Sequence, residues 1–402
     1  MRKEMAFNIA TESRTVSRYF KALGIRSAED GDKFWLGIGK KFGTNTRRQL
    51  ESIIEARTDS QGKGDIYSAK NKNLALTIEF ARWSTDLYRG FLEWFVGYVS
   101  HSPRAILDVG CDNGIVTCFY AWKYPEASVV GMDSNAFGIE CARELAKQIG
   151  LTNVKFIESD IGDAEQYCGK GYFDVVTSLR SFNEVIGIPQ FPPHWRKDDI
   201  PINPGPPEQA LLGVRSVMDN NGVLITADRF YGPLIDGTVW WAKKLSTIGL
   251  NIDWQTSDWL SFHEVGYYQS MPVIVAGHAI PSSSIVDGAI ALHLKESGAF
   301  PSSEQSSLDG LGAELRFDDL SDKQLVQGVE VDLADMSGRV RIEVWKHSYG
   351  VVMYQYSNTG IRKIDCYDTA LLQQVLSIVE EELENSPYRI RSTSERYTNP
   401  RM

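Results

Sequence analysis

The sequence has little of what builds disulfide scaffolds, zinc sites or membrane spans. Its 402 residues include only five cysteines and no Cys-x-x-Cys pair. This low, odd number excludes a disulfide-rich extracellular scaffold, and without the pair a structural zinc site has no basis. No run approaches 18 apolar residues, and the start lacks the long apolar core of a secretory signal. We therefore expect a cytoplasmic protein with no membrane partner and no metal site.

Positive charge is also scarce. Lys and Arg number 42 against 52 Asp and Glu, which gives a net charge of −10. The balance is uneven, since residues 1–99 carry an excess of five basic residues while residues 100–280 and 281–402 carry excesses of eight and seven acidic ones. An acidic surface repels phosphate backbones, so nucleic acid is disfavoured as a partner. The asymmetry supports a division into regions.

The pattern of apolar residues changes along the chain and predicts these regions. Residues 1–100 read as a helical N-terminal cap. In residues 101–281, short apolar runs alternate with helical segments, which predicts an α/β fold with a mostly parallel sheet. Residues 282–312, rich in Ser and Gly, read as a linker. Residues 313–388 alternate with period two before a final helix, which predicts a small antiparallel meander plus helix, and residues 389–402 read as a tail.

The first strand of the middle region runs into a glycine-containing turn. Ala105–Val109 is apolar except for Asp108, and Gly110 and Gly114 separate it from the helical segment Ile115–Trp122. Glycine allows close approach of the backbone to a ligand, and a helix N-terminus offers free N–H groups. This arrangement is typical of a nucleotide-binding edge of a parallel sheet.

The next three strands end in polar residues. Asp133 follows the second strand, where a carboxylate can accept hydrogen bonds from both hydroxyls of a ribose. Asp160 follows the third strand and can accept from an adenine amino group, with Ile161 against the ring. The fourth strand, Phe173–Thr177, ends beside Ser178. In an open parallel sheet these ends meet at one edge and face one crevice.

The four strand ends together resemble the class I S-adenosylmethionine-dependent methyltransferase superfamily. The resemblance covers about residues 104–280 and is most specific between Ala105 and Val185. It implies a Rossmann-like sheet of seven strands, S-adenosylmethionine as cofactor, and methyl transfer by in-line displacement. By position, it implies that the cofactor-binding residues are Asp108, Gly110, Cys111, Asp112, Gly114, Asp133, Ser134, Asp160, Ile161, Ser178 and Leu179.

One position of the loop departs from the family pattern. The family usually has acid-x-Gly-x-Gly-x-Gly, and Asp112 stands here at the middle glycine. Asp adopts unusual backbone angles more readily than most residues. It also adds a second acid near the ammonium group of the cofactor. Without a middle glycine the loop does not match Gly-x-Gly-x-x-Gly, which weakens the alternative of a nicotinamide dehydrogenase.

The sequence says less about the methyl acceptor. The fourth strand runs into Thr177–Glu184, which has neither the Asn/Asp-Pro-Pro-Tyr/Phe motif of amino-group methylation nor the paired glutamates of arginine methyltransferases. Acidic charge and a proline-rich segment favour a small organic acceptor. A protein acceptor recognised by the C-terminal domain and a non-catalytic scaffold that keeps the fold are the alternatives. The oligomeric state is open, and a homodimer is one option.

No catalytic residue is assigned from the sequence. His194, Glu184 and Tyr231 are candidate general bases, needed only if the acceptor must lose a proton early. Four tryptophans lie close together in the sequence and either wall the acceptor or pack in the core. They are Trp240, Trp241, Trp254 and Trp259.

Overall fold

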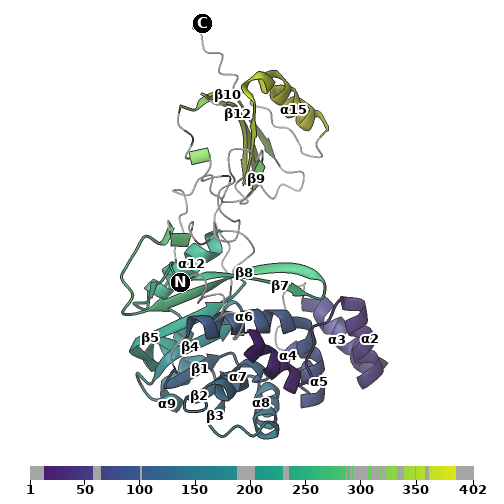
Figure 1. The fold of residues 1–402 in the computed structure, drawn as a ribbon, viewed down its shortest axis with the longest axis vertical. Coiled ribbons are helices and arrows are strands. Elements are labelled where there is room, and N and C mark those ends of the chain that lie inside the picture. Colours follow the sequence, from purple (N-terminus) through teal and green to yellow (C-terminus); the bar gives the residue numbers. More distant parts are fainter. Residues whose placement is uncertain are drawn as a thin grey trace. The chain divides into compact units, whose positions relative to one another are not determined.

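The computed structural model divides the chain into two compact units, with the boundary after Ser283 (Figure 1). It describes residues 13–57, 65–99, 102–187, 204–229 and 235–286, and beyond them mainly the segments 307–309, 322–332, 339–348, 350–357 and 362–385. The first unit holds the described residues up to Ser283, apart from residues 235–240 at the start of helix α12.

The first unit is built on a sheet of eight strands in the order β3-β2-β1-β4-β5-β8-β6, with β7 also paired to β8. The parallel strands are β1 (Ala105–Val109), β2 (Ser128–Asp133), β3 (Val154–Glu158), β4 (Phe173–Leu179) and β5 (Met218–Ala227). β8 (Tyr267–Gly277) is antiparallel to β5 and pairs with β7 (Asp258–Glu264) and β6 (Asn251–Ile252). The predicted Rossmann-like sheet is confirmed. The eighth strand, β6, was not predicted, because two residues carry no periodic signal.

Helices follow the strands as a parallel sheet requires. They are α7 (Ile115–Lys123), α8 (Ala136–Gln148), η2 (Ile161–Asp163), α9 (Ala164–Cys168), α10 (Phe182–Val185), α11 (Gln209–Val217) and α12 (Ile235–Ser246). α7 begins where Gly114 turns left-handed, and α8 begins where the Asn135 side chain accepts from the Gly138 N–H.

The N-terminal helices share a core with the sheet. They comprise residues 13–22, α2 (Gly31–Phe42), α3 (Thr44–Arg57), α4 (Asp65–Lys70), α5 (Leu74–Phe80), η1 (Ala81–Ser84) and α6 (Thr85–Tyr98). The ring of Phe95 on α6 lies 4.6 Å from that of Tyr120 on α7. The Tyr19 hydroxyl donates a 2.7 Å hydrogen bond to the Ile115 carbonyl. Buried contacts of this kind place α4 and α5 beside α8, next to the ends of the first strands.

The second unit is an antiparallel sheet with one helix. Its order is β10-β11-β12-β13-β9. The strands are β9 (Ser307–Asp309), β10 (Gln324–Asp332), β11 (Arg339–His347), β12 (Gly350–Ser357) and β13 (Arg362–Tyr367), followed by η4 (Thr369–Leu371) and α15 (Leu372–Asn385). Val375 and Val379 of α15 pack on Val344 and Met353. The predicted meander plus helix is thus present, and β9 lies inside the segment that was expected to be a linker.

Among the helices of the described residues, none combines the length and the apolar character that a bilayer crossing requires.

Candidate functional site

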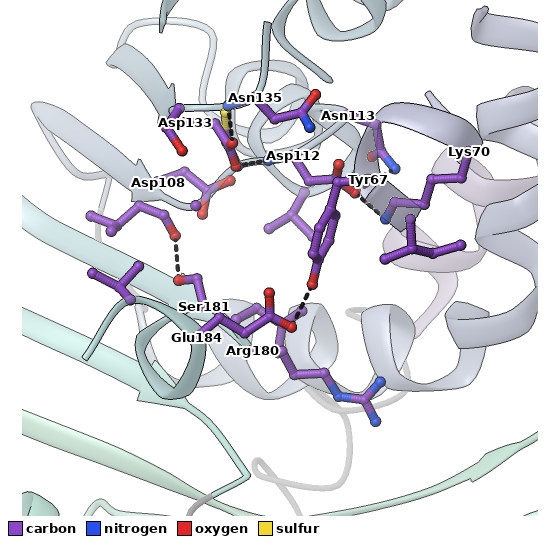
Figure 2. Close-up of a pocket in the computed structure, with 18 of the residues that line it drawn as sticks. Tyr67, Lys70, Asp108, Asp112, Asn113, Asp133, Asn135, Arg180, Ser181 and Glu184 are labelled. Atoms are coloured by element: carbon purple, nitrogen blue, oxygen red, sulfur yellow. Dashed lines mark hydrogen bonds and ion pairs between the residues drawn. The ribbon is translucent and has the colours of Figure 1, made fainter. Parts of the chain in front are cut away.

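A cavity of about 970 Å³ opens at the carboxyl ends of the parallel strands in the first unit (Figure 2). One side is formed by the strand ends and the turns after them, and the other by side chains of the N-terminal helices, β4–α10 and β7. The structure therefore brings together residues that are far apart in the sequence. Nine of the predicted site residues lie on its wall: Asp108, Gly110, Cys111, Asp112, Asp133, Ser134, Asp160, Ile161 and Leu179.

Gly114 and Ser178 do not line the cavity. Gly114 has a φ of +73°, and a Cβ there would lie 2.5 Å from Ala142 Cβ, so the position must be glycine for α7 to pack against α8. Ser178 is fully buried, and its hydroxyl is hydrogen-bonded to that of Ser181.

Gly110 is also required by the chain's own packing. Its φ is +67°, and a Cβ there would lie 2.3 Å from Ser181 Cβ. Ser181 in turn donates to the Val109 carbonyl at 3.0 Å (Figure 2). The close approach at this turn is therefore to the β4–α10 turn, whereas the glycine pattern was expected to make room for a ligand. Cys111 lines the cavity next to it, with its thiol buried and the thiol pKa raised by that burial.

Asp108 is a carboxyl group with a strongly shifted pKa. Its side chain is 3% exposed and accepts hydrogen bonds from Thr117 Oγ1 at 2.5 Å and Thr177 Oγ1 at 3.1 Å. Burial, with a smaller contribution from the charge of Asp133, raises its pKa to about 7. Near neutral pH this group can exist in either protonation state, and a cation in the cavity would favour the ionised one.

Asp133, at the end of β2, is held rigidly by the backbone. Its Oδ2 accepts from the Asp112 N–H and its Oδ1 from the Asn135 N–H, both at 2.8 Å. Burial and the nearby Asp112 charge raise the pKa of this carboxyl. Each oxygen keeps a further lone pair for a ligand, as recognition of two vicinal hydroxyls requires.

Asp112 adopts the left-handed backbone, with φ +45°. Its side chain turns toward α4, where Lys70 Nζ lies 2.6 Å from Oδ2 (Figure 2). Asn71 Nδ2 lies 2.5 Å from Oδ1. Burial alone would lower the pKa of Lys70, but the Asp112 carboxylate raises it above its ordinary value. The charge of Asp112 is therefore already compensated by Lys70. Asp112 was expected to act as a second acid for the ammonium group of the cofactor, but its carboxylate is paired with this lysine instead.

Asp160 begins the short helix η2 and lies on the cavity wall. Its Oδ1 accepts from the Gly162 N–H at 2.8 Å, so it caps this helix. The second oxygen is not used by that cap, and Ile161 lies beside it, buried.

The sequence did not reveal the opposite side of the cavity. Of the residues on that side, only Glu184 on α10 had been predicted from the sequence to belong to the site, as a candidate base. The Tyr67 hydroxyl donates to Glu184 Oε1 at 2.7 Å across 117 residues of chain (Figure 2). Only tertiary packing makes such neighbours, so no local pattern could have indicated them. The main residues found this way are Tyr67, Lys70, Phe80, Trp83, Tyr88, Arg180, Arg229 and Glu264.

Glu264 on β7 gathers several donors at this side. Arg180 Nη1 and Nη2 lie 2.6 and 3.2 Å from its two oxygens, and Arg229 Nη2 lies 2.5 Å from Oε2. Ser84 Oγ donates to Oε1 at 2.7 Å. Burial alone would raise the pKa of Glu264, but the two guanidinium groups lower it below its usual value.

The other sequence candidates are two possible bases and the clustered tryptophans. His194 and Tyr231 fall outside the described residues. Trp241 is fully buried, packs on Phe182 and donates to Thr226 Oγ1 at 2.9 Å, which is a packing role. None of the four clustered tryptophans is among the described residues that line the cavity.

The sheet order, the antiparallel β7–β8 pair and a cavity lined by strand-end carboxylates define a class I, S-adenosylmethionine-dependent methyltransferase domain. The carboxyl groups fit the cofactor of this class. Asp133 retains free lone pairs that can accept from ribose hydroxyls, and a cationic cofactor would favour the ionised form of Asp108. In agreement, a family model described as a methyltransferase domain matches residues 100–236.

Curated relatives match about a fifth to a quarter of this chain. A ribosomal RNA small subunit methyltransferase G of Streptococcus equi subsp. zooepidemicus is 29% identical over 107 residues, which are 26% of this chain and 44% of the relative. A trans-aconitate 2-methyltransferase of Acidovorax ebreus is 31% identical over 85 residues, 21% of this chain and 31% of the relative. The chain thus spans less than half the length of either protein.

One solved structure aligns over about half of this chain. An S-adenosylmethionine-dependent methyltransferase from Aquifex aeolicus aligns with 51% of this chain and 97% of its own, with 16% identity and a TM-score of 0.34.

Proposed function

We propose that this chain transfers the methyl group of S-adenosylmethionine to a small organic acceptor bound in the same cavity. The observation that carries this proposal is the cavity itself. It joins the strand-end carboxylates to a compartment of aromatic and charged side chains without interruption. Binding both partners side by side in one cavity is what a displacement between them requires.

The strand-end residues would hold the cofactor. We assign the ribose hydroxyls to Asp133, the adenine to Asp160 and Ile161, and the methionine portion to Asp108 and the turn from Gly110 to Asp112. When bound, the cofactor supplies a methyl group that its sulfonium centre makes electrophilic. The chain's contribution is rigid placement, because Asp133 is fixed by two backbone N–H groups and Asp112 is anchored by Lys70.

The opposite side of the cavity would hold the acceptor. The half-buried rings of Phe80, Trp83 and Tyr88 line this side, and the packing of the N-terminal helices fixes their positions. Glu184, which accepts from Tyr67, is the group we assign to take up a proton if the acceptor must lose one. Positioning contributes most to such a displacement, so a base is secondary.

A protein acceptor recognised by the second unit is the alternative within the same chemistry, and a scaffold without activity is the alternative outside it. The acidic charge argues against nucleic acid, although one relative is named for ribosomal RNA. We place the protein in the cytoplasm because all five cysteines are free thiols.

Calorimetric titration with S-adenosylhomocysteine tests the proposal. We expect saturable binding to the wild type and none to Asp133→Ala, with wild-type affinity for Glu140→Ala, which removes an exposed acid on α8. Absence of binding to the wild type at sub-millimolar concentration would overturn the proposed function.

A further inference from the structure

We infer that the acceptor is a small organic acid, with an apolar body against Phe80, Trp83 and Tyr88 and an anionic group at the guanidinium of Arg229. This inference deepens the proposed function and rests on it, because it concerns the acceptor half of the same cavity.

The first argument is the charge around Glu264. Two guanidinium groups, those of Arg180 and Arg229, share this single carboxylate. With Ser84 as a further donor, Glu264 receives four hydrogen bonds, which use the lone pairs of both of its oxygens. One positive charge of the cluster therefore remains unmatched. Burial and the neighbouring Arg180 both lower the pKa of Arg229, as expected where like charges lie close together.

The second argument is the difference between the two arginines. The Arg180 side chain is 19% exposed, bonds to both oxygens of Glu264 and lies over the ring of Phe262 at 5.2 Å. The Arg229 side chain is 45% exposed and uses only Nη2, so its Nε and Nη1 groups have no partner among the described residues. Arg180 thus fixes Glu264, whereas Arg229 has N–H groups in the fork geometry that suits a carboxylate or phosphate.

Other charges of this half are already engaged. Lys70 is paired with Asp112, and Glu184 accepts from Tyr67. In Figure 2 the side chain of Arg180 extends away from the Tyr67–Glu184 pair. An anion is therefore expected at the arginines and not near Glu184.

The third argument is the rigidity of the apolar wall. The rings of Phe80 and Trp83 lie 5.5 and 5.0 Å from that of Phe34, which is buried behind them. Tyr88 adds a ring whose hydroxyl has no hydrogen bond among the described residues. Rings fixed in this way present a preformed surface for an apolar body.

The backbone of Arg180 is consistent with a functional role. Its φ is +58°, a left-handed conformation that is uncommon for a residue other than glycine. Strain of this kind persists where the surrounding structure holds it, and it gathers at functional sites. Here it directs the side chain from the end of β4 to Glu264 on β7.

Binding of matched acid and amide probes tests the inference. Benzoate, 3-phenylpropanoate and octanoate are titrated by saturation-transfer NMR against benzamide, 3-phenylpropanamide and octanamide, with the protein saturated with S-adenosylhomocysteine. We expect at least one acid to bind about tenfold more tightly than its amide. Arg229→Gln should abolish this preference, and Arg229→Lys, which keeps the charge but loses the fork geometry, should retain only part of it. Arg48→Gln, on an exposed position of α3, should behave as the wild type.

The affinity for S-adenosylhomocysteine separates the two claims. It should stay within twofold of the wild-type value in all three variants, and its absence in the wild type would overturn the proposed function itself. If the wild type binds S-adenosylhomocysteine but shows no acid preference for any pair, or if Arg229→Gln keeps the preference, the inference is overturned while the proposed function stands.

Discussion

Lys70 Nζ lies 2.6 Å from Asp112 Oδ2, so a helix 42 residues upstream is joined to the turn that follows β1. Both side chains are mostly buried, with exposed fractions of 12% and 19%. Asp112 also donates its N–H to Asp133. The N-terminal helices are in this way connected to the proposed cofactor site, and the substitution of a family glycine by Asp112 is what makes the connection.

We expect Lys70→Met to destabilise the protein by about 3 kcal/mol, because it leaves a buried carboxylate without its partner. The double variant Lys70→Met/Asp112→Asn should recover most of that loss, since no unpaired charge remains. Urea denaturation of the wild type, the Lys70→Met and Asp112→Asn variants and the double variant gives the coupling energy directly. A loss in the double variant equal to the sum of the two single losses would show that the pair is not coupled.

The sequence was sufficient for the sheet apart from β6 and for the strand-end residues, because both follow from local patterns. Asp108, Asp133 and Asp160 were found from apolar runs that end in an acid. The acceptor side was not predictable, since Tyr67 and Glu184 meet across 117 residues. For the turn after β1, the sequence indicated only that Asp112 would tolerate unusual backbone angles. Its pairing with Lys70 and the contact of Gly110 with Ser181 depend on packing between elements.

Gly110→Ala should destabilise the protein by about 2–3 kcal/mol, because it combines a left-handed backbone with a collision against Ser181. Gly150→Ala is the matched control. Its φ is +73° and a Cβ there meets nothing within 4 Å. The substitution should therefore cost only about 1 kcal/mol of stability, from backbone strain alone. Adding Ser181→Gly to Gly110→Ala should restore part of the difference in urea midpoint. Identical losses in the two alanine variants would contradict the packing role of Gly110.

Asp108 should make stability depend on pH. Its folded-state pKa of about 7 lies above that of an unfolded chain, about 4, so the folded state binds the proton more tightly. Its contribution is therefore fully present below about pH 4 and is lost as the pH rises through 7. Asp108→Asn removes this titration. The free energy of unfolding of the variant should therefore rise relative to that of the wild type between pH 5 and pH 8. A constant difference across this range would show that Asp108 is already ionised in the folded state.

The same titration should control ligand binding. An ammonium group next to Asp108 requires the ionised carboxylate, so the affinity for S-adenosylhomocysteine should fall by up to about tenfold per pH unit below 7. Methylthioadenosine, which lacks the ammonium group, should show a smaller dependence, due to Asp133. Asp108→Asn should remove the difference between the two ligands. Parallel pH profiles for both ligands in the wild type would contradict the assignment of Asp108 to the methionine portion.

Glu264→Gln should cost about 3 kcal/mol near pH 7, because it leaves Arg180 and Arg229 together without a carboxylate. The pKa of Glu264 is lowered in the folded state, so its contribution is present above the unfolded value of about 4.3 and is lost as the pH falls through the folded value. The difference from the wild type should therefore shrink in acid. Glu126→Gln, an exposed control, should match the wild type throughout.

A crystal structure of the protein grown with S-adenosylhomocysteine tests the central claim most directly. The proposed function predicts the ribose hydroxyls at Asp133, the adenine beside Asp160 and Ile161, and the sulfur facing the compartment of Tyr67, Trp83 and Tyr88. A cavity that excludes the ligand, or a ligand whose sulfur faces away from this compartment, would contradict it.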